Sequence, residues 1–168
     1  MTRGERWVPA YVGIGSNLDD PRKQVERALA ALADLDASRL IAASGRYRSA
    51  PLGPPDQPWY VNAAAGLITQ LEPEPLLQAL KEIEATLGRR PLRQRWGPRR
   101  IDLDLLMYGA VELATPALTV PHPGLTTRSF VLYPLADFAA EVEVPGRGRV
   151  ADLLRDVPLA GLEPIETV

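Results

Sequence analysis

Short apolar runs separated by polar stretches occupy the first two thirds of the chain, and they predict four strands. Each run is bounded by glycine, proline, serine or charged residues, as buried strands commonly are. The third run is apolar enough to be buried on both faces, and Asn62 is its unexpected polar residue. The four runs are VPAYVGIGS from Val8, LIAASGRYRS at 40–49, YVNAAAGLITQ at 60–70 and RIDLDLLMY at 100–108.

Two amphipathic stretches lie between these runs and predict helices. The first starts at Asp19-Asp20-Pro21, an aspartate cap followed by proline in the first turn. Its apolar residues recur at the i, i+3, i+4 and i+7 spacing of one helix face: Val25, Ala28, Leu29 and Leu32. The second opens at Glu74-Pro75, and Gly88 is placed to end it. Its inward residues are Leu76, Leu77, Leu80, Ile83 and Leu87.

The order of these elements predicts the fold class. Strand, helix, two strands, helix and strand give a β-α-β-β-α-β arrangement, which is the ferredoxin-like order. We therefore expect an α+β fold with a ferredoxin-like core and additional C-terminal elements. VLYPLADFAAE (131–141) and VADLLRDV (150–157) predict helix in that tail. We expect one domain over residues 1–168, with the charged residues 1–6 as a frayed tail.

Composition narrows the class of protein. The chain has no cysteine, which excludes disulfides and cysteine-ligated zinc. It has no run of about 18 apolar residues, so no helix is expected to span a membrane, and its N-terminus lacks the apolar region of a secretory signal. These features predict a cytoplasmic protein that does not act at a membrane.

Positive charge is concentrated in one segment of a mildly acidic chain. The net charge is −2, yet residues 89–100 contain six of the 19 basic residues and none of the 21 acidic ones. Pro91 and Gly97-Pro98 interrupt this stretch, which predicts a loop. Asp102 and Asp104 follow directly on the fourth strand.

Alternation along a strand places Asp102 and Asp104 on the same face, with their Cα atoms roughly 6.5–7 Å apart. Such a carboxylate pair suits Mg²⁺, which takes one or two carboxylates together with waters and substrate phosphates. Arginines beside it would complete a clamp for a polyphosphate. The residues alone leave an alternative open, in which the aspartates pair with nearby arginines on a solvated face.

Other kinds of site fit these residues less well. A calcium loop is excluded because Leu106 stands where that motif needs an oxygen ligand. An RNA-binding module could use the arginines with Trp96 as a stacking platform, but the aspartates and the negative net charge oppose a phosphate backbone. A nucleotide-sugar transferase also uses D-x-D with a metal, although it calls for a larger nucleotide-binding domain.

Four segments in order resemble one family. GIGSNL (13–18), APLGPPDQPWYVNAA (50–64), RWGPRRIDLDLLMYG (95–109) and VPHPGLTTRSFVLYPL (120–135) are similar to the signatures of the 6-hydroxymethyl-7,8-dihydropterin pyrophosphokinases. The resemblance implies transfer of diphosphate from ATP to the hydroxymethyl group of the pterin, with release of AMP, in folate biosynthesis. It also implies a ferredoxin-like fold, two Mg²⁺ ions, a monomer, and small-molecule substrates without nucleic acid or membrane partners.

The resemblance also implies roles for individual residues. Asp102 and Asp104 would be the metal ligands, and with Arg89 and Arg99 they would form the catalytic set. The residues implied in ATP binding are Glu84, Arg89, Trp96, Arg99, Leu105, Thr119, His122 and Arg128. Those implied in pterin binding are Ser49, Ala50, Leu52, Tyr60, Asn62, Trp96 and Phe130.

Pterin chemistry is compatible with these roles. A flat heterobicycle binds well between two aromatic faces, here Tyr60 and Phe130, and the Asn62 amide offers both a donor and an acceptor. From the residues alone, Tyr60 and Phe130 could equally belong to the core. His122, the single histidine, could likewise be structural.

Overall fold

The computed structural model describes residues 3–50, 56, 58–88, 101–159 and 161–165. The described part of the first 108 residues contains two helices and five strands, and most of the later elements are short. The elements are β1 (Arg3–Ser16), α1 (Pro21–Ala33), β2 (Ser38–Ala43), β3 (Arg46–Ser49), β4 (Tyr60–Leu71), α2 (Pro73–Thr86), β5 (Asp102–Tyr108), β6 (Leu113–Ala114), β7 (Thr119–Val120), α3 (Ser129–Ala139), β8 (Glu143–Val144), β9 (Gly148–Arg149), α4 (Val150–Leu153), a 3₁₀ turn (Leu154–Asp156) and β10 (Leu162–Ile165).

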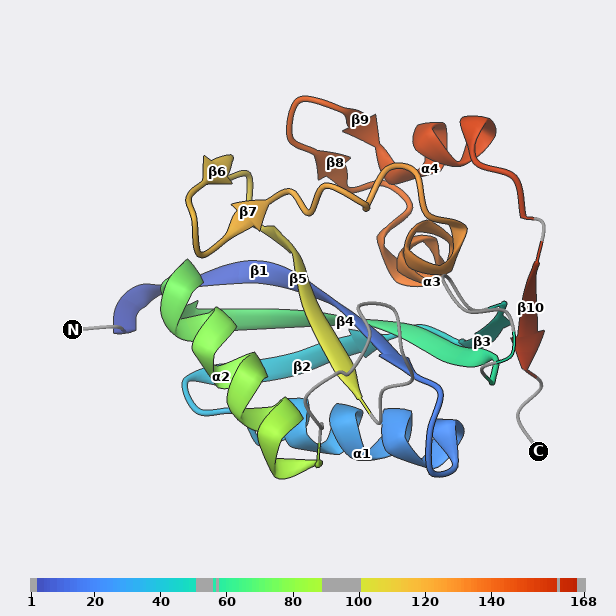
Figure 1. Cartoon of the computed structure of the whole chain (residues 1–168). Helices are drawn as coiled ribbons and strands as arrows, with labels where there is room; N and C mark the ends of the chain where they lie inside the picture. Colours follow the sequence, from blue (N-terminus) through green and yellow to red (C-terminus); the bar gives the residue numbers. More distant parts are fainter. Residues whose placement is uncertain (1–2, 51–55, 57, 89–100, 160, 166–168) are drawn as a thin grey trace.

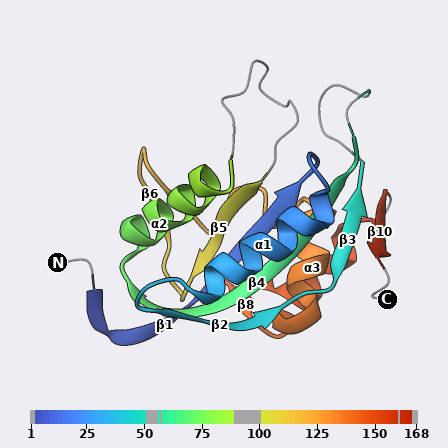
Figure 2. The same cartoon turned by 90° about the horizontal axis from the view of Figure 1, so that it is seen from below.

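The main sheet is antiparallel and has the strand order β10-β3-β4-β1-β5, with β2 also paired to β4. Helices α1 and α2 cover one face of this sheet, and α3 and α4 lie on the other (Figure 1). Seen from the α1 side, α1 lies in front of the strands and α2 lies beside β5 (Figure 2). The molecule is therefore a mixed structure in which one sheet separates two helical layers.

Each helical layer encloses its own hydrophobic core. Val25 and Ala28 of α1 and Leu76 and Leu80 of α2 pack on Val12, Leu67 and Leu105 of the sheet. On the opposite face, Leu132 and Leu135 of α3 pack with Leu106, Met107 and Val150. Because both faces are covered, β4 is buried along most of its length, as its apolar sequence predicts.

Strand β5 contributes to both cores, and a bulge interrupts its side-chain alternation. Val12 pairs with Leu105 and Tyr11 with Met107, so Leu106 is the extra residue of a bulge. A Cβ on Gly13 would lie 3.4 Å from the Leu106 side chain, so Gly13 and Leu106 are close neighbours across the two strands. The strict alternation expected for this run therefore holds from Asp102 to Leu106 and is broken at Met107, which packs in the same core as Leu106.

Several boundaries differ from expectation. The strand predicted at 40–49 is two strands, because the chain bends at Ser44, whose buried hydroxyl accepts a hydrogen bond from the backbone N–H of Ala64 at 2.8 Å. Residues 3–6, expected as part of a frayed tail, belong to β1, which begins at Arg3, paired with Leu71. Helix α2 begins at Pro73, slightly before the expected start.

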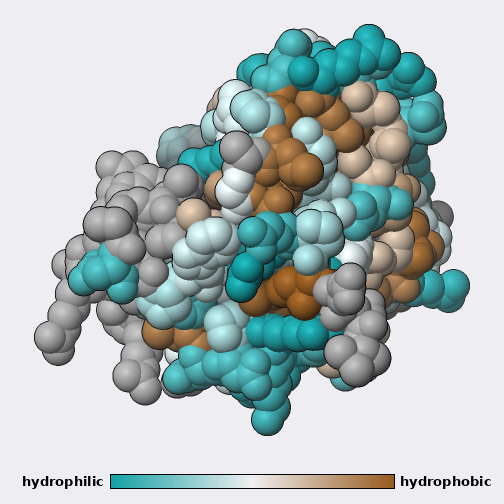
Figure 3. Space-filling model, turned by 90° about the vertical axis from the view of Figure 1, so that its right-hand side faces the viewer, coloured by the Kyte–Doolittle hydropathy of each residue, from teal (hydrophilic) through white to brown (hydrophobic). Residues whose placement is uncertain are grey.

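The tail contains the expected helices. The segment VLYPLADFAAE lies largely in α3, and VADLLRDV forms α4 and the 3₁₀ turn. The chain then returns as β10 along the outer edge of β3. The side of the molecule that includes β10 presents apolar areas bordered by polar side chains (Figure 3). In the described part of the chain, no helix combines the length and apolar character needed to cross a membrane.

Candidate active site

A cavity of about 430 Å³ opens where β1, β4 and β5 meet the ends of α2 and α3. Its walls are drawn from both helical layers, because α2 and α3 lie on opposite faces of the sheet (Figure 1). The volume falls within the usual range for small-molecule sites, about 300–1,000 Å³. The lining residues are Gly13, Ile14, Gly15, Ser49, Ala50, Tyr60, Asn62, Ala63, Leu77, Lys81, Glu84, Asp102, Leu103, Asp104, His122, Arg128, Phe130 and Val131.

This cavity brings together many of the residues singled out in the sequence. Those that line it are Ser49, Ala50, Tyr60, Asn62, Glu84, Asp102, Asp104, His122, Arg128 and Phe130. Leu105 and Thr119 do not line it: Leu105 is buried in the core beneath α1 and α2, and Thr119 is exposed on β7. The predictions for Leu52, Arg89, Trp96 and Arg99 fall outside the described residues.

Some lining residues were not predicted as site residues, although the sequence around two of them, Lys81 and Gly15, indicates a special position. Lys81 lies three residues before Glu84, and this spacing puts both on one face of α2. Gly15 lies inside a strand, where glycine often marks a close approach. A Cβ there would lie 3.4 Å from Asn62 Oδ1. Ile14, Ala63, Leu77, Leu103 and Val131 resemble ordinary core residues, so no pattern distinguishes them.

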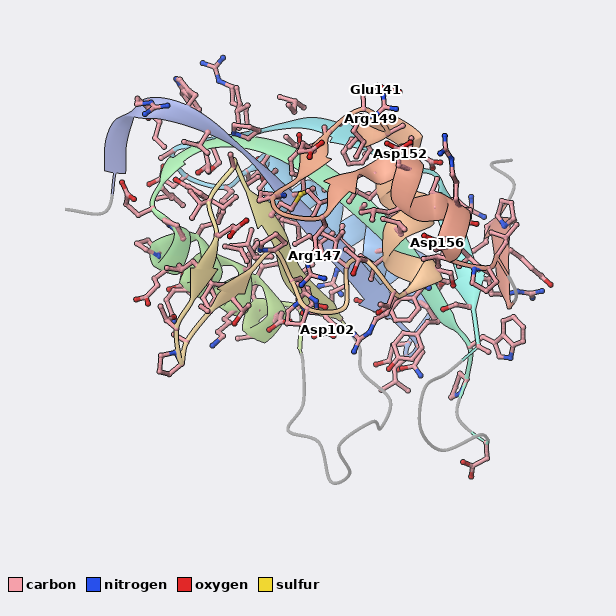
Figure 4. The ribbon with its side chains drawn as sticks, turned by 90° about the horizontal axis from the view of Figure 1, so that it is seen from above. Asp102, Glu141, Arg147, Arg149, Asp152 and Asp156 are labelled. Carbon is pink, nitrogen blue, oxygen red and sulfur yellow. The ribbon has the colours of Figure 1, made fainter. Side chains whose placement is uncertain are left out.

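The acidic wall comes from β5 and α2. Asp102 and Asp104 are partly buried, whereas Leu103 and Leu105 between and beyond them are buried on the other face. Asp102 lies at the start of β5, far from the charged cluster of Glu141, Arg149 and Asp152 (Figure 4). The backbone N–H of Leu103 donates to the buried Glu84 carboxylate at 2.8 Å. Three carboxylates are thus concentrated on one side of the cavity.

The opposite wall carries a buried amide. Asn62 Nδ2 donates to Ser49 Oγ at 2.6 Å, and both residues are buried. Antiparallel pairing of β3 with β4 sets this contact, since Tyr47 pairs with Asn62 and Ser49 with Tyr60. Asn62 therefore satisfies the hydrogen-bonding need of a polar residue inside a buried strand.

Cationic and aromatic side chains complete the cavity next to α3. The guanidinium of Arg128 lies over the Phe130 ring, 5.9 Å from its centroid. Gly124 makes room for Arg128, because a Cβ at this position would lie 2.7 Å from Arg128 Nε. Phe130 is partly buried and lies in the first turn of α3. The contact therefore sets a positive charge beside an aromatic face on this wall.

His122 is held in one tautomer. Its Nδ1 accepts a hydrogen bond from the backbone N–H of Gly124 at 3.0 Å, which leaves the ring proton on Nε2. Burial, followed by the positive charge of Arg128, lowers the pKa of His122, and Asp102 opposes this shift to a smaller extent. At neutral pH this residue is consequently an uncharged hydrogen-bond donor facing the cavity.

The donor set fits a hard divalent cation with an incomplete protein shell. Across residues 3–50, 58–88, 101–159 and 161–165, no three acidic or histidine side chains converge in a way that could hold a metal ion. Asp102 and Asp104 supply hard oxygen donors on one face of β5. Mg²⁺ commonly binds one or two carboxylates and completes its coordination with water and substrate phosphates. The residues present are compatible with that mode.

Comparison with known proteins agrees on one family. The model of the 7,8-dihydro-6-hydroxymethylpterin-pyrophosphokinase (HPPK) family matches residues 11–140. The chain is similar to 2-amino-4-hydroxy-6-hydroxymethyldihydropteridine pyrophosphokinases from Pseudomonas aeruginosa and Haemophilus influenzae. It is 49% identical to the first over 154 residues, covering 91% of this chain and 94% of the relative. It is 42% identical to the second over 148 residues, covering 88% and 92%.

A solved structure supports the same fold at low sequence identity. Plasmodium falciparum HPPK-DHPS, crystallised with pteroate, superposes with a TM-score of 0.74 and 13% identity, covering 93% of this chain. This chain spans 43% of that longer one. The family match spans β1 to α3 and therefore every element that lines the cavity. The chain belongs to the 7,8-dihydro-6-hydroxymethylpterin-pyrophosphokinase family.

Proposed function

We propose that this chain transfers the diphosphate of ATP to the hydroxymethyl group of 6-hydroxymethyl-7,8-dihydropterin and releases AMP. The observation that carries the proposal is the composition of the cavity. One wall holds the β5 aspartates, and the other holds the Ser49–Asn62 pair with aromatic residues beside it. A site with one acidic and one amide–aromatic half is suited to a metal-bound polyphosphate and a flat heterocycle.

Family membership and topology also support the finer fold assignment. The order β1-α1-β2/β3-β4-α2-β5 and the central strand order β3-β4-β1-β5 support a ferredoxin-like sheet. In this proposal α3, α4 and β10 are the additional C-terminal elements. They matter for function because Phe130 of α3 lies on the cavity.

For the pterin, the proposal assigns Tyr60 and Phe130 to the two faces of the ring and Asn62 to its hydrogen-bonding edge. Ser49 orients the Asn62 amide by accepting one of its protons, which leaves the amide oxygen and a second N–H for the ligand. Ala50 and Leu52 belong to the same half of the proposed site. Because this half is built from β3 and β4, its geometry is set by strand pairing.

For the nucleotide, the proposal assigns Asp102 and Asp104 to two Mg²⁺ ions, with Glu84 and Lys81 nearby on α2. When bound, Mg²⁺ would neutralise phosphate charge and orient the diphosphate for in-line attack. Arg128 and neutral His122 supply a cation and an N–H donor for phosphate oxygens. Arg89, Trp96 and Arg99 keep the roles that the resemblance implies.

The chain's own contribution to the reaction is therefore positioning and charge. The pterin hydroxyl is held against the β-phosphorus while the α-phosphate departs with AMP. Phosphoryl transfer needs little covalent help from protein groups. Since the amide–aromatic wall fixes the acceptor and the acidic wall fixes the donor, the distance between the two walls sets the reacting geometry.

The test is AMP formation from ATP and Mg²⁺, measured with and without 6-hydroxymethyl-7,8-dihydropterin. We expect AMP release that depends on the pterin and is lost in Asp102→Asn. Asp156→Asn serves as a matched control because Asp156 is exposed and lies apart from Asp102 (Figure 4). A folded protein that binds an ATP analogue but gives no AMP with this pterin would contradict the proposal. RNA binding that survives Asp102→Asn would favour the RNA-binding alternative.

A further inference from the structure

Glu84 is a carboxylate with 4% of its surface exposed, placed near the end of α2. Taking a charged carboxylate out of water is costly unless it is well hydrogen-bonded. Its Oε2 accepts the backbone N–H of Leu103 at 2.8 Å. The contact therefore fixes a particular point of β5 relative to α2.

That point lies between the two aspartates. Asp102, Leu103 and Asp104 pair with Gly15, Ile14 and Gly13 of β1, and β5 is the last strand of the sheet. In an antiparallel pair the backbone groups of successive residues point alternately to one neighbour and to the other side. Because the Leu103 N–H reaches Glu84, it points to the outer edge, and the backbone groups of its neighbours point to β1. Residues 102–104 are therefore held by β1 on one side and by Glu84 of α2 on the other.

The contact with β5 gives Glu84 a role other than direct metal binding. Glu84, Asp102 and Asp104 all line the cavity. Nonetheless, within the part of the chain that the structure describes, they do not form a three-ligand group able to hold an ion. One oxygen of the Glu84 carboxylate, Oε2, is bound to the strand backbone. The contact also joins the helix before the arginine-rich segment to the strand after it.

From these contacts we propose that Glu84 is a positioning residue that acts through the Leu103 amide to set the spacing and direction of the Asp102 and Asp104 carboxylates. This inference deepens the proposed function and rests on it, since it takes the two aspartates to be the metal ligands. This role differs from a direct contact with the nucleotide. What matters is that the Glu84 side chain is long enough for its oxygen to accept the Leu103 N–H, and its charge matters less for this role.

Two substitutions separate reach from charge. Glu84→Gln keeps the length of the side chain and an oxygen acceptor but removes the charge. Glu84→Asp keeps the charge but is one methylene shorter, so its oxygen no longer reaches the Leu103 N–H. Both substitutions keep a polar side chain that is no longer than glutamate. Circular dichroism checks that each variant is folded.

The first readout is Mn²⁺ affinity in the presence of α,β-methylene-ATP, whose α–β bridge resists cleavage. Partners behind metal ligands typically change metal affinity about 10–100-fold when removed. We expect Glu84→Asp to weaken Mn²⁺ binding about tenfold and Glu84→Gln to weaken it less than about threefold. The opposite order would show that charge or direct ligation is what matters, and it would overturn the proposal.

The second readout is the hydrogen exchange of the Leu103 amide, measured by NMR without nucleotide or metal. We expect this amide to stay protected in Glu84→Gln and to exchange at least tenfold faster in Glu84→Asp. Equal protection in both variants would overturn the proposal. Neither readout uses turnover, so the two proposals can fail separately. If the wild type gives no pterin-dependent AMP release but the two Glu84 variants differ as expected in both readouts, the proposed function is refuted and this inference stands.

Discussion

The hydroxyl of Tyr47 donates a hydrogen bond to Asp137 at 2.7 Å, and this contact ties β3 to α3. The same carboxylate accepts the backbone N–H of Gly45 at 2.9 Å, at the bend between β2 and β3. Both joined elements reach the cavity, β3 through Ser49 and α3 through Phe130. The Tyr47–Asp137 contact therefore joins the two elements that carry Ser49 and Phe130, although neither Tyr47 nor Asp137 lines the cavity.

Replacing Tyr47 by phenylalanine should lower the free energy of unfolding by about 1.5 kcal/mol, because one hydrogen bond to a charged acceptor is lost while the ring remains. Urea denaturation at neutral pH measures this change. Tyr133→Phe provides a comparison, since its hydroxyl donates to the Val157 carbonyl, a neutral acceptor. A Tyr47→Phe effect below that of Tyr133→Phe would contradict the expected strength of the contact.

The same residue predicts a loss of stability in alkali. Burial, and then the hydrogen bond to Asp137, raises the pKa of Tyr47 above its ordinary value. A group whose pKa is raised on folding contributes stability below its unfolded pKa of about 10 and loses it as the pH rises further. Unfolding free energy should therefore fall above pH 10, and less steeply in Tyr47→Phe. Tyr11 and Tyr108 also have a raised pKa, so some slope should remain.

An ion pair between α1 and β3 predicts a small effect in acid. Arg46 contacts both oxygens of Glu26, at 2.5 and 2.8 Å, and this hydrogen bonding lowers the pKa of Glu26. A lowered pKa gives stability above the unfolded value, and this stability is lost as the pH falls through the folded one. Half of the Glu26 side chain is exposed, so Glu26→Gln should cost less than about 1 kcal/mol at neutral pH.

Urea midpoints at neutral pH and in acid test this contact. We expect the difference between Glu26→Gln and the wild type to shrink as the pH falls below 4.5, the ordinary pKa of glutamate. Glu163→Gln is a matched control, because Glu163 forms an exposed pair with Arg48. A difference that grows in acid would mean that the assigned sign is wrong.

The hydroxyl of Ser49 should affect pterin binding through Asn62. Ser49→Ala removes the acceptor of the Asn62 amide, and a single hydrogen bond of this kind contributes about 0.5–1.5 kcal/mol. We expect pterin affinity to fall about two- to tenfold, with ATP-analogue affinity unchanged, as measured by calorimetry. Ser49→Thr retains the hydroxyl and should bind pterin like the wild type. An equal loss in both variants would point to steric disturbance.

Lys81 should contribute modest electrostatic attraction for the nucleotide. It lies on the cavity side of α2, and an exposed charge pair is worth about 0.2–1 kcal/mol. Lys81→Ala should therefore weaken ATP binding by up to about fivefold, and added salt should reduce the difference. The neighbouring exposed Glu82, which does not line the cavity, supplies the control Glu82→Ala. A loss that is insensitive to salt would count against an electrostatic role.

Periodicity predicted the parts of the molecule that depend on local pattern. The i, i+3, i+4 spacing from Val25 identified α1, and the two-residue spacing of Asp102 and Asp104 placed both carboxylates toward the cavity. The apolar run at 60–70 gave β4 almost to the residue. In each case the spacing of apolar and polar residues within a short segment shows which side chains are buried.

Features that depend on distant partners could not be predicted in this way. The bend at Ser44 follows from its contact with Ala64, twenty positions along the chain. The bulge at Leu106 is a feature of the pairing of β5 with another strand, β1. The expected role of Leu105 came from the family resemblance, whereas the structure buries this side chain in the core. The bend at Ser44, the bulge at Leu106 and the burial of Leu105 all depend on residues that are distant in the sequence.

The contact between Glu84 and Leu103 also has a consequence for how copies of this protein meet one another. β5 is an outer strand, and outer strands offer unpaired backbone groups to which another chain can add by strand pairing. Here the outward N–H of Leu103 is already taken by a side chain from α2, which also packs along this edge (Figure 1). A foreign strand would have to displace Glu84 before it could pair. The contact that orders the acidic wall thus also protects this edge of the sheet from aggregation.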